Sequence, residues 1–180
     1  HVLKIPSEPR IYFDFGSVMH RVIEHVSDVK KEGGIPTREE AHRVLDLFWP
    51  KTSFLTATQE HEKRATAIRI LDTYLVWEQE NPNTILSCEE SFTFSLGDSS
   101  FTGKIDRIEK TPEGRLRVID FKTGKKPSSL TKASIPEEIQ LNLYSLALRN
   151  IHGTLPEKAS FFYLEDGKFV DYIPSAETIR

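Results

Sequence analysis

Hydrophobic positions in the first half of the chain recur at the three- and four-residue spacing of a helix. The pattern predicts three helices, over residues 15–31, 37–48 and 58–80. Thr37, with Glu40 three positions later, is a capping-box pattern that opens the second helix. The third helix is expected to bury one apolar face, formed by Ala65, Ile68, Leu71 and Leu75.

Near residue 84 the pattern changes to the alternation that is typical of strands. Strands are predicted over residues 84–96, 101–109, 115–122, 159–164 and 168–173. One more helix, over residues 134–150, interrupts them, because Ser134, Pro136 and Glu137 form a typical helix start. The elements predict a single α/β domain over residues 1–180, with a small mixed sheet and helices packed on it.

Composition supports a folded domain. Hydrophobic residues make up 38% of the 180 residues, and no stretch approaches the roughly 20 apolar residues of a membrane helix. Because Cys88 is the single cysteine, the chain alone cannot form a disulfide or a Cys-rich metal cluster. We expect Cys88 to be a half-buried strand residue. Because the chain begins with His1 rather than Met, we also expect it to be a fragment of a longer protein.

Positive charge is concentrated in one segment of an otherwise acidic chain. The net charge is −3, yet Lys104 to Lys132 contains nine basic and four acidic residues, a local +5. Such a segment suits contacts with phosphates, and it is equally typical of an ordinary solvated face.

Two acids and a lysine lie on neighbouring predicted strands. Asp120 and Lys122 project from one face of their strand, and Asp106 lies across a hairpin from them. Converging carboxylates repel unless a cation lies between them, and oxygen ligands suit Mg²⁺ or Mn²⁺. The alternative is two surface ion pairs, Asp106 with Arg107 and Asp120 with Lys122. The apolar neighbours of Asp120 favour a functional site, because an unpaired buried acid is costly.

The motifs resemble those of a known family. Gly103-x-x-Asp106, Asp120-x-Lys122 and Gln140-x-x-x-Tyr144 are similar to the PD-(D/E)xK nuclease superfamily, and more narrowly to RecB-type exonuclease domains. Residues 15–24 resemble the family helix that carries a metal-ligating histidine, and Glu89 or Glu90 resembles an acid near the first core strand. The resemblance covers about residues 14–164. It implies an α/β restriction-endonuclease-like core.

The resemblance also implies roles for residues. His20, Asp106, Asp120 and the backbone carbonyl of Phe121 would bind Mg²⁺ or Mn²⁺, and Lys122 would position the attacking water. In the same way the resemblance assigns catalysis to Asp106, Asp120 and Lys122, and DNA contacts to Gln140 and Tyr144. Without it, Gln140 and Tyr144 could be a helix-surface pair, or Tyr144 could be core. The cysteines of the iron–sulfur branch are missing, so the chain is similar to the cluster-free branch.

Two further groups are accessory candidates. Glu24, one helical turn after His20, could orient its ring or could be an exposed acid. Lys125 and Lys126, with Lys132, could bind a nucleic-acid backbone beside the metal, or could be a solubilising loop.

The function expected is metal-dependent hydrolysis of DNA phosphodiesters. We expect an exonuclease with a preference for single strands, working in DNA repair or recombination in an intracellular compartment such as the bacterial cytoplasm. Family habit implies a helicase in the same chain or complex, and no membrane partner is expected. Two alternatives stay open, a non-catalytic DNA-binding nuclease-like domain and a metal hydrolase of small phosphate esters.

Overall fold

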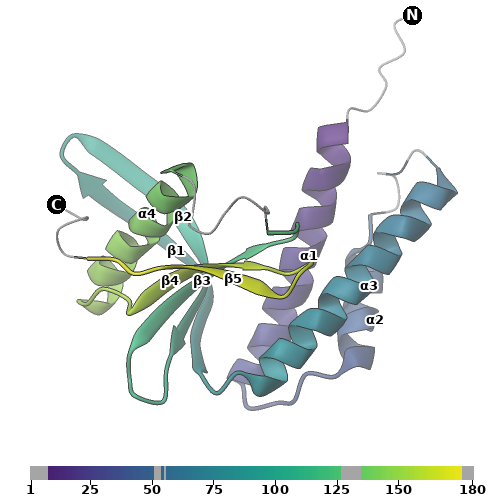
Figure 1. Cartoon of the computed structure of the whole chain (residues 1–180), viewed down its shortest axis with the longest axis horizontal. Coiled ribbons are helices and arrows are strands. Elements are labelled where there is room, and N and C mark those ends of the chain that lie inside the picture. The colour runs from purple at the N-terminus through teal and green to yellow at the C-terminus, as the bar shows by residue number, and fades with distance from the viewer. Residues whose placement is uncertain (1–7, 51–53, 55, 127–134, 176–180) are drawn as a thin grey trace, which may run out of the picture.

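The computed structural model describes residues 8–50, 54, 56–126 and 135–175 (Figure 1). Its helices are α1 (Glu8–Lys31), α2 (Arg38–Phe48), α3 (Ala57–Glu80) and α4 (Ile135–His152). Its strands are β1 (Thr84–Leu96), β2 (Ser99–Lys110), β3 (Leu116–Lys122), β4 (Lys158–Tyr163) and β5 (Lys168–Tyr172). Each lies close to a predicted element. None of these helices has the length and apolar composition needed to cross a membrane.

The strands form one mixed sheet in the order β1-β2-β3-β4-β5. Only β3 and β4 are parallel among these neighbours, with Val118 opposite Ala159 and Asp120 opposite Phe161. Parallel neighbours need a crossover connection, and α4 lies in that connection. The crossover places α4 on one face of the sheet, while α1, α2 and α3 gather on the other (Figure 1).

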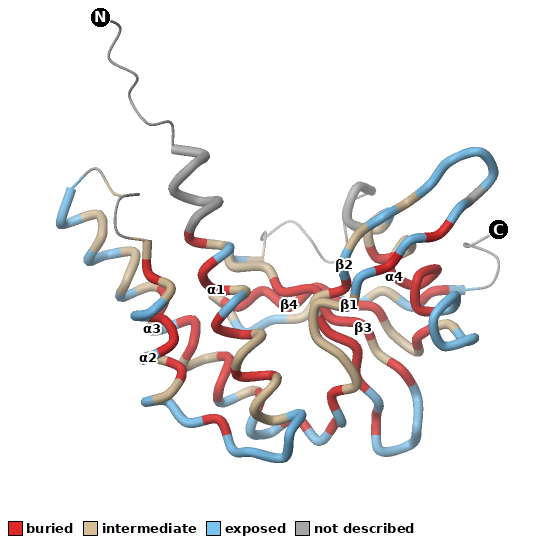
Figure 2. Tube along the Cα trace, turned by 180° about the vertical axis from the view of Figure 1, so that it is seen from behind, coloured by how far each residue is buried: buried red, intermediate tan, exposed pale blue. Residues whose placement is uncertain are grey.

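Each face of the sheet has its own hydrophobic core. Toward α1–α3, Ile119, Phe121 and Phe162 of the sheet pack with apolar residues of the three helices. Toward α4, Val118 and Phe161 pack with Leu141 and other residues of that helix. Because side chains of a strand alternate between faces, β3 serves both cores and is buried at five of its seven positions. Figure 2 shows the buried stretches running through the centre of the sheet.

Local sequence signals set the helix ends. The Thr37 hydroxyl accepts a hydrogen bond from the Glu40 backbone N–H at 3.2 Å, as the capping box predicts. The predicted buried face of α3 is partly wrong, since Ala65 is exposed and Ile68 only half-buried. The buried residues are Ala67, Ile70, Leu71, Tyr74, Leu75 and Glu78. The face is rotated because α3 buries Tyr74 and Glu78, whose polar groups a hydrophobic pattern does not reveal.

Candidate active site

Two consecutive residues of β2 turn toward α1. Asp106 contacts His20 and Arg107 contacts Ser27, both residues of α1. Ile105 and Ile108, which flank them, both belong to the core on the α4 side. Strict alternation would put Ile105 and Arg107 on one face, so the alternation breaks between Asp106 and Arg107.

The neighbouring strand is irregular at the same level. Glu89 of β1 has φ of +50°, and among the described residues it is the one non-glycine with a positive φ. Its neighbours Cys88 and Glu90 pair with Arg107 and Ile105, so Glu89 lies across from Asp106. A positive φ costs energy for a residue with a Cβ, and such strain is common at functional sites.

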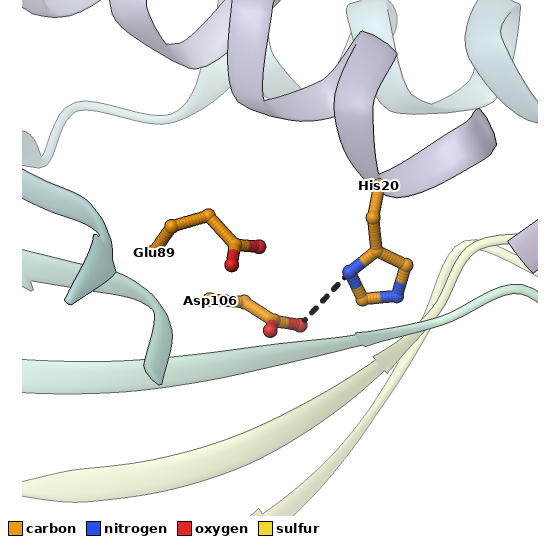
Figure 3. Close-up of side chains that lie close together, drawn as sticks. All are labelled: His20, Glu89 and Asp106. Carbon is orange, nitrogen blue, oxygen red and sulfur yellow. Dashed lines mark ion pairs between the residues drawn. The ribbon is translucent and has the colours of Figure 1, made fainter. Parts of the chain in front are cut away.

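These irregularities bring three potential metal ligands together. His20, Glu89 and Asp106 each offer a ligating atom, and these atoms lie within 4.8 Å of one another. Nδ1 of His20 is 3.5 Å from Oδ2 of Asp106. Figure 3 shows the three side chains pointing toward one another from α1 and the sheet. We call His20, Glu89 and Asp106 the metal-site cluster.

Asp106 lies where β2 and β3 separate. The β2–β3 ladder runs from Lys110 opposite Leu116 only as far as Arg107 opposite Ile119. Beyond it, the Phe121 backbone N–H donates to Oδ2 of Asp106 at 2.8 Å. A side-chain carboxylate therefore replaces the next backbone acceptor and is held against the residue that follows Asp120.

The metal-site cluster concentrates negative charge around the largely buried Asp106. Burial, together with the negative charges of Asp120 and Glu89, raises the pKa of Asp106 to about 7 against the lowering effect of His20 and the Phe121 N–H. Burial and Glu89 likewise raise the pKa of Glu24, which borders the same small cavity. Converging carboxylates of this kind are stabilised by a cation.

Asp120 is held by three side chains on the α4 side of β3. Gln140 Nε2 and the Tyr144 hydroxyl each donate to its Oδ1 at 3.0 Å. Lys122 Nζ is 2.7 Å from its Oδ2, yet this oxygen has no hydrogen bond of ordinary geometry among the described residues. Asp120 is 4% exposed, so Oδ2 is a buried acceptor with capacity left for another ligand.

Lys122 is fixed in place by the same residues. Its ammonium donates to Oε1 of Gln140 at 3.2 Å and lies 4.5 Å from the centre of the Phe161 ring. Gln140 also donates to the Tyr144 hydroxyl at 2.7 Å. Gln140 and Tyr144, which lie on one face of α4 as their spacing predicts, are thus connected to Asp120 and Lys122. Tyr144 is buried, and burial, then the charge of Asp120, raises its pKa.

Gly103 has a packing role in this arrangement. A Cβ at Gly103 would lie 2.7 Å from the Phe92 ring, which faces it across the β1–β2 pair. The Phe92 ring in turn contacts Tyr144 edge-on, with 6.1 Å between centroids. Glycine is therefore required here because it lets Phe92 support the tyrosine that holds Asp120.

The donor set fits a hard divalent cation. His20, Glu89 and Asp106 offer one nitrogen and carboxylate oxygens, and the free Oδ2 of Asp120 adds one more acceptor. Asp120 is not part of the three-residue grouping, although its charge raises the pKa of Asp106. Glu89, rather than Glu90, is the acid that the structure brings to the cluster. Metal ligation by His20, Asp106, Asp120 and the Phe121 carbonyl stays a prediction.

One alternative drawn from the sequence is wrong, and two accessory groups stay predictions. Arg107 does not pair with Asp106 at the surface, since it is fully buried and pairs with Glu78 and Glu109. Lys125 is exposed and lies 3.8 Å from Glu165, while Lys126 donates its backbone N–H to Asp166.

Two predictions remain, for the loop residue Lys132 and for Cys88. Lys132 lies outside the described residues. Cys88 is half-buried in β1 as predicted, and burial raises the pKa of its thiol to about 11.

Comparison with known proteins gives the family. The chain is 30% identical, over 141 residues, to an ATP-dependent helicase/deoxyribonuclease subunit of Streptococcus mutans, covering 75% of this chain and 13% of that protein. The chain thus spans about an eighth of the length of this relative.

Two solved structures align with most of the chain. SSO0001 aligns with TM-score 0.40, 15% identity and coverage of 92% of this chain and 69% of that one. A candidate exonuclease from Eubacterium rectale aligns with TM-score 0.43, 13% identity and coverage of 89% and 60%.

The family model of the PD-(D/E)XK nuclease superfamily matches residues 1–178. The match spans every described element, so the mixed sheet and its flanking helices are the restriction-endonuclease-like α/β core that the motifs predict. The chain belongs to the PD-(D/E)XK nuclease superfamily.

Proposed function

We propose that this nuclease domain is a Mg²⁺- or Mn²⁺-dependent deoxyribonuclease that hydrolyses phosphodiester bonds as an exonuclease with a preference for single strands. The observation that carries the proposal is the position of Lys122. Its ammonium is fixed beside Asp120, and the charge of Asp120 acts on the metal-site cluster. A lysine ammonium held by an acid whose charge reaches the metal-site cluster suits the attack of water on a phosphate.

The residues divide the work. His20, Asp106 and Asp120, with Glu89 and the Phe121 carbonyl, would hold the cation, which when bound supplies Lewis-acid stabilisation of charge on the phosphate. Lys122 would donate a hydrogen bond to the attacking water or to a phosphate oxygen. Gln140 and Tyr144 would keep Oδ1 of Asp120 engaged, so that Oδ2 stays available.

A polar surface beside the cluster supports a nucleic-acid substrate. On the β1–β2 hairpin, exposed residues pair across the strands, Ser91 with Lys104 and Thr93 with Thr102. Lys104 reaches Glu89 at 3.4 Å, so this face leads directly to the metal-site cluster. Hydroxyl and ammonium groups are common partners of phosphates. In Figure 2 the hairpin extends well beyond the rest of the sheet.

The biological setting is part of the proposal. The Streptococcus mutans relative is named as a helicase/deoxyribonuclease subunit. We infer by analogy a role in DNA repair or recombination, in an intracellular DNA-containing compartment, with a helicase in the same chain or complex. Lys125 and Lys126 would add backbone contacts next to the site.

End-labelled single-stranded DNA incubated with the protein and Mn²⁺ tests the proposal. We expect stepwise shortening from an end, its loss in EDTA, slower cleavage of duplex DNA and no cleavage of circular single strands. Lys122→Ala should remove cleavage while DNA binding persists, and Lys168→Ala, an exposed lysine on β5, should leave both unchanged. Binding of DNA without any product from the wild type would favour the non-catalytic alternative.

A further inference from the structure

Arg107 is the centre of a buried polar cluster directly beside the metal-site cluster. Its guanidinium is fully buried and donates through both terminal nitrogens to Glu78. It also donates to the hydroxyls of Tyr74 at 3.0 Å and Ser27 at 3.3 Å, and lies 2.7 Å from Oε1 of Glu109. We call Arg107, Ser27, Tyr74, Glu78 and Glu109 the Arg107 cluster. It joins α1, α3 and β2.

The charges of the Arg107 cluster are matched once the neighbouring Lys30 is counted. Lys30 of α1 lies 2.7 Å from Glu78, so two basic groups face two carboxylates. Asn81 and Asn83 donate to the two oxygens of Glu109 at 2.7 and 2.8 Å. Among the described residues, Nε of Arg107 has no hydrogen-bond partner. A buried network whose charges are paired in this way still holds its members in one arrangement, since any displacement leaves a charge unpaired.

The Arg107 cluster touches the candidate active site at two points. Ser27 borders the small cavity of about 10 Å³ that His20 and Asp106 also border. The Tyr74 ring packs edge-on against Phe121, with 5.6 Å between centroids, and the Phe121 N–H is the group that holds Asp106.

Helix geometry extends the first of these links to His20. Ser27 lies seven residues after His20, two helical turns along the same face of α1. A hydrogen bond that fixes Ser27 therefore also fixes the rotation of α1 that points His20 at Asp106.

We propose that the Arg107 cluster is the positioning unit of the metal centre. Arg107 holds Ser27 and Tyr74 so that His20 and the Phe121 N–H keep their places around Asp106. Arg107 is next to Asp106 in the chain. Because Glu78 and Glu109 neutralise its charge, Arg107 does not repel the metal cation. Arg107, Ser27 and Tyr74 are positioning residues, which touch neither substrate nor cation. The inference rests on the proposed metal-dependent function.

Mn²⁺ binding to the chain without DNA tests the inference, because this readout is separate from cleavage. Titration calorimetry on Ser27→Ala and Tyr74→Phe should show Mn²⁺ affinity about tenfold weaker than in the wild type, a loss typical of groups that orient metal ligands. Both substitutions remove a hydroxyl and leave the side-chain packing nearly intact. Val170→Ala, a buried change on β5, is the control for general loss of stability and should bind Mn²⁺ as the wild type does.

The outcomes separate the two proposals. A wild type that does not bind Mn²⁺ overturns the proposed function. If the wild type binds and both hydroxyl variants, shown to be folded by circular dichroism, bind equally well, the positioning role is wrong. An equal loss of Mn²⁺ affinity in Val170→Ala would also overturn the positioning role, because the weaker binding would then follow from lower stability alone.

Discussion

The Arg107 cluster and the metal-site cluster lie next to each other beneath α1, and both remove charged groups from water. In the Arg107 cluster every charge has an opposite partner within hydrogen-bonding distance. In the metal-site cluster, the largely buried Asp106 has only a histidine as basic partner among the described residues, since the lysines that pair with Glu89 and Asp120 lie at the edge of the cluster, where Lys104 is exposed. Paired buried charges hold a structure in one arrangement. Buried charges without a partner make the folded state less stable, and a ligand of opposite charge removes that cost when it binds.

The two clusters have opposite dependence on pH. For Glu78, burial raises the pKa, but the hydrogen bonds and charge of Arg107 lower it overall. Its contribution to stability is therefore present at neutral pH and lost as the pH falls through the lowered pKa. For Asp106 the pKa is raised, so the folded state is most favoured in acid and loses stability as the pH rises toward about 7.

The largest expected effect comes from removing the charge of Asp120. Asp120→Asn keeps the side-chain volume and can still accept from Tyr144, so the fold should persist. We expect the rate of DNA cleavage in Mn²⁺ to fall by about 10³-fold or more, because the acceptor that faces Lys122 loses its charge. Gel assays of single-turnover cleavage measure this. Cleavage within tenfold of wild type would exclude Asp120 from the metal site.

Arg107→Met should be the most damaging change on the matched side. Glu78 and Glu109 would then be buried without their common partner, at a cost of about 3–5 kcal/mol of unfolding free energy. Glu78→Gln should cost less, because Arg107 keeps Glu109 and the half-buried Lys30 can reach water. Urea denaturation measures both values. A loss below about 1 kcal/mol for Arg107→Met would show that the charges are not tightly coupled.

Some contacts of the candidate site could be predicted from the sequence. Asp120 and Lys122 are correctly placed together, because a strand puts residues two apart on one face and the hairpin brings the strand of Asp106 alongside. Helical spacing likewise places Gln140 and Tyr144 on one face, but only the family resemblance brings that face to Asp120. Such regularities are local, and they follow directly from the order of residues.

Arg107 and Glu89 show where local reasoning fails. The alternation of β2 breaks between Asp106 and Arg107, so a residue that looks like a surface ion-pair partner is buried. Its partner Glu78 is 29 residues away on α3, and no spacing rule connects them. Glu89 reaches the cluster from a backbone with a positive φ, a conformation that its residue type does not predict.

Asp106→Asn tests whether the metal-site cluster causes a loss of folding stability as the pH rises. In EDTA, wild-type stability should decline by about 4 kcal/mol between about pH 4 and 7, because over this range the carboxyl of Asp106 ionises in the unfolded state but stays protonated in the folded state. Asp106→Asn lacks this loss, so it should be the more stable protein at neutral pH. Added Mn²⁺ should stabilise the wild type and not the variant. Urea unfolding at the two ends of this pH range measures the difference, and an equal decline in both proteins would contradict the assignment to Asp106.

The smallest effect is expected at the exposed edge of the metal-site cluster. Lys104 is 59% exposed and lies 3.4 Å from Glu89, so solvent screens the pair and its loss should change stability by less than about 1 kcal/mol. Lys104→Ala should instead weaken single-strand binding about two- to fivefold, with a shallower dependence on salt, because one phosphate contact is lost. Fluorescence anisotropy in EDTA at several salt concentrations measures this.

Lys158→Ala is the matched control for Lys104→Ala, since Lys158 pairs with Asp171 at 2.7 Å on the distant strand β4. It should leave the affinity for single strands and its salt dependence unchanged. If both lysine variants lose affinity equally, the effect reflects net charge alone, and the hairpin face is not the path of the strand. If Lys104→Ala alone loses affinity, the DNA strand runs along the hairpin face next to the metal-site cluster, where its phosphates can reach the bound cation.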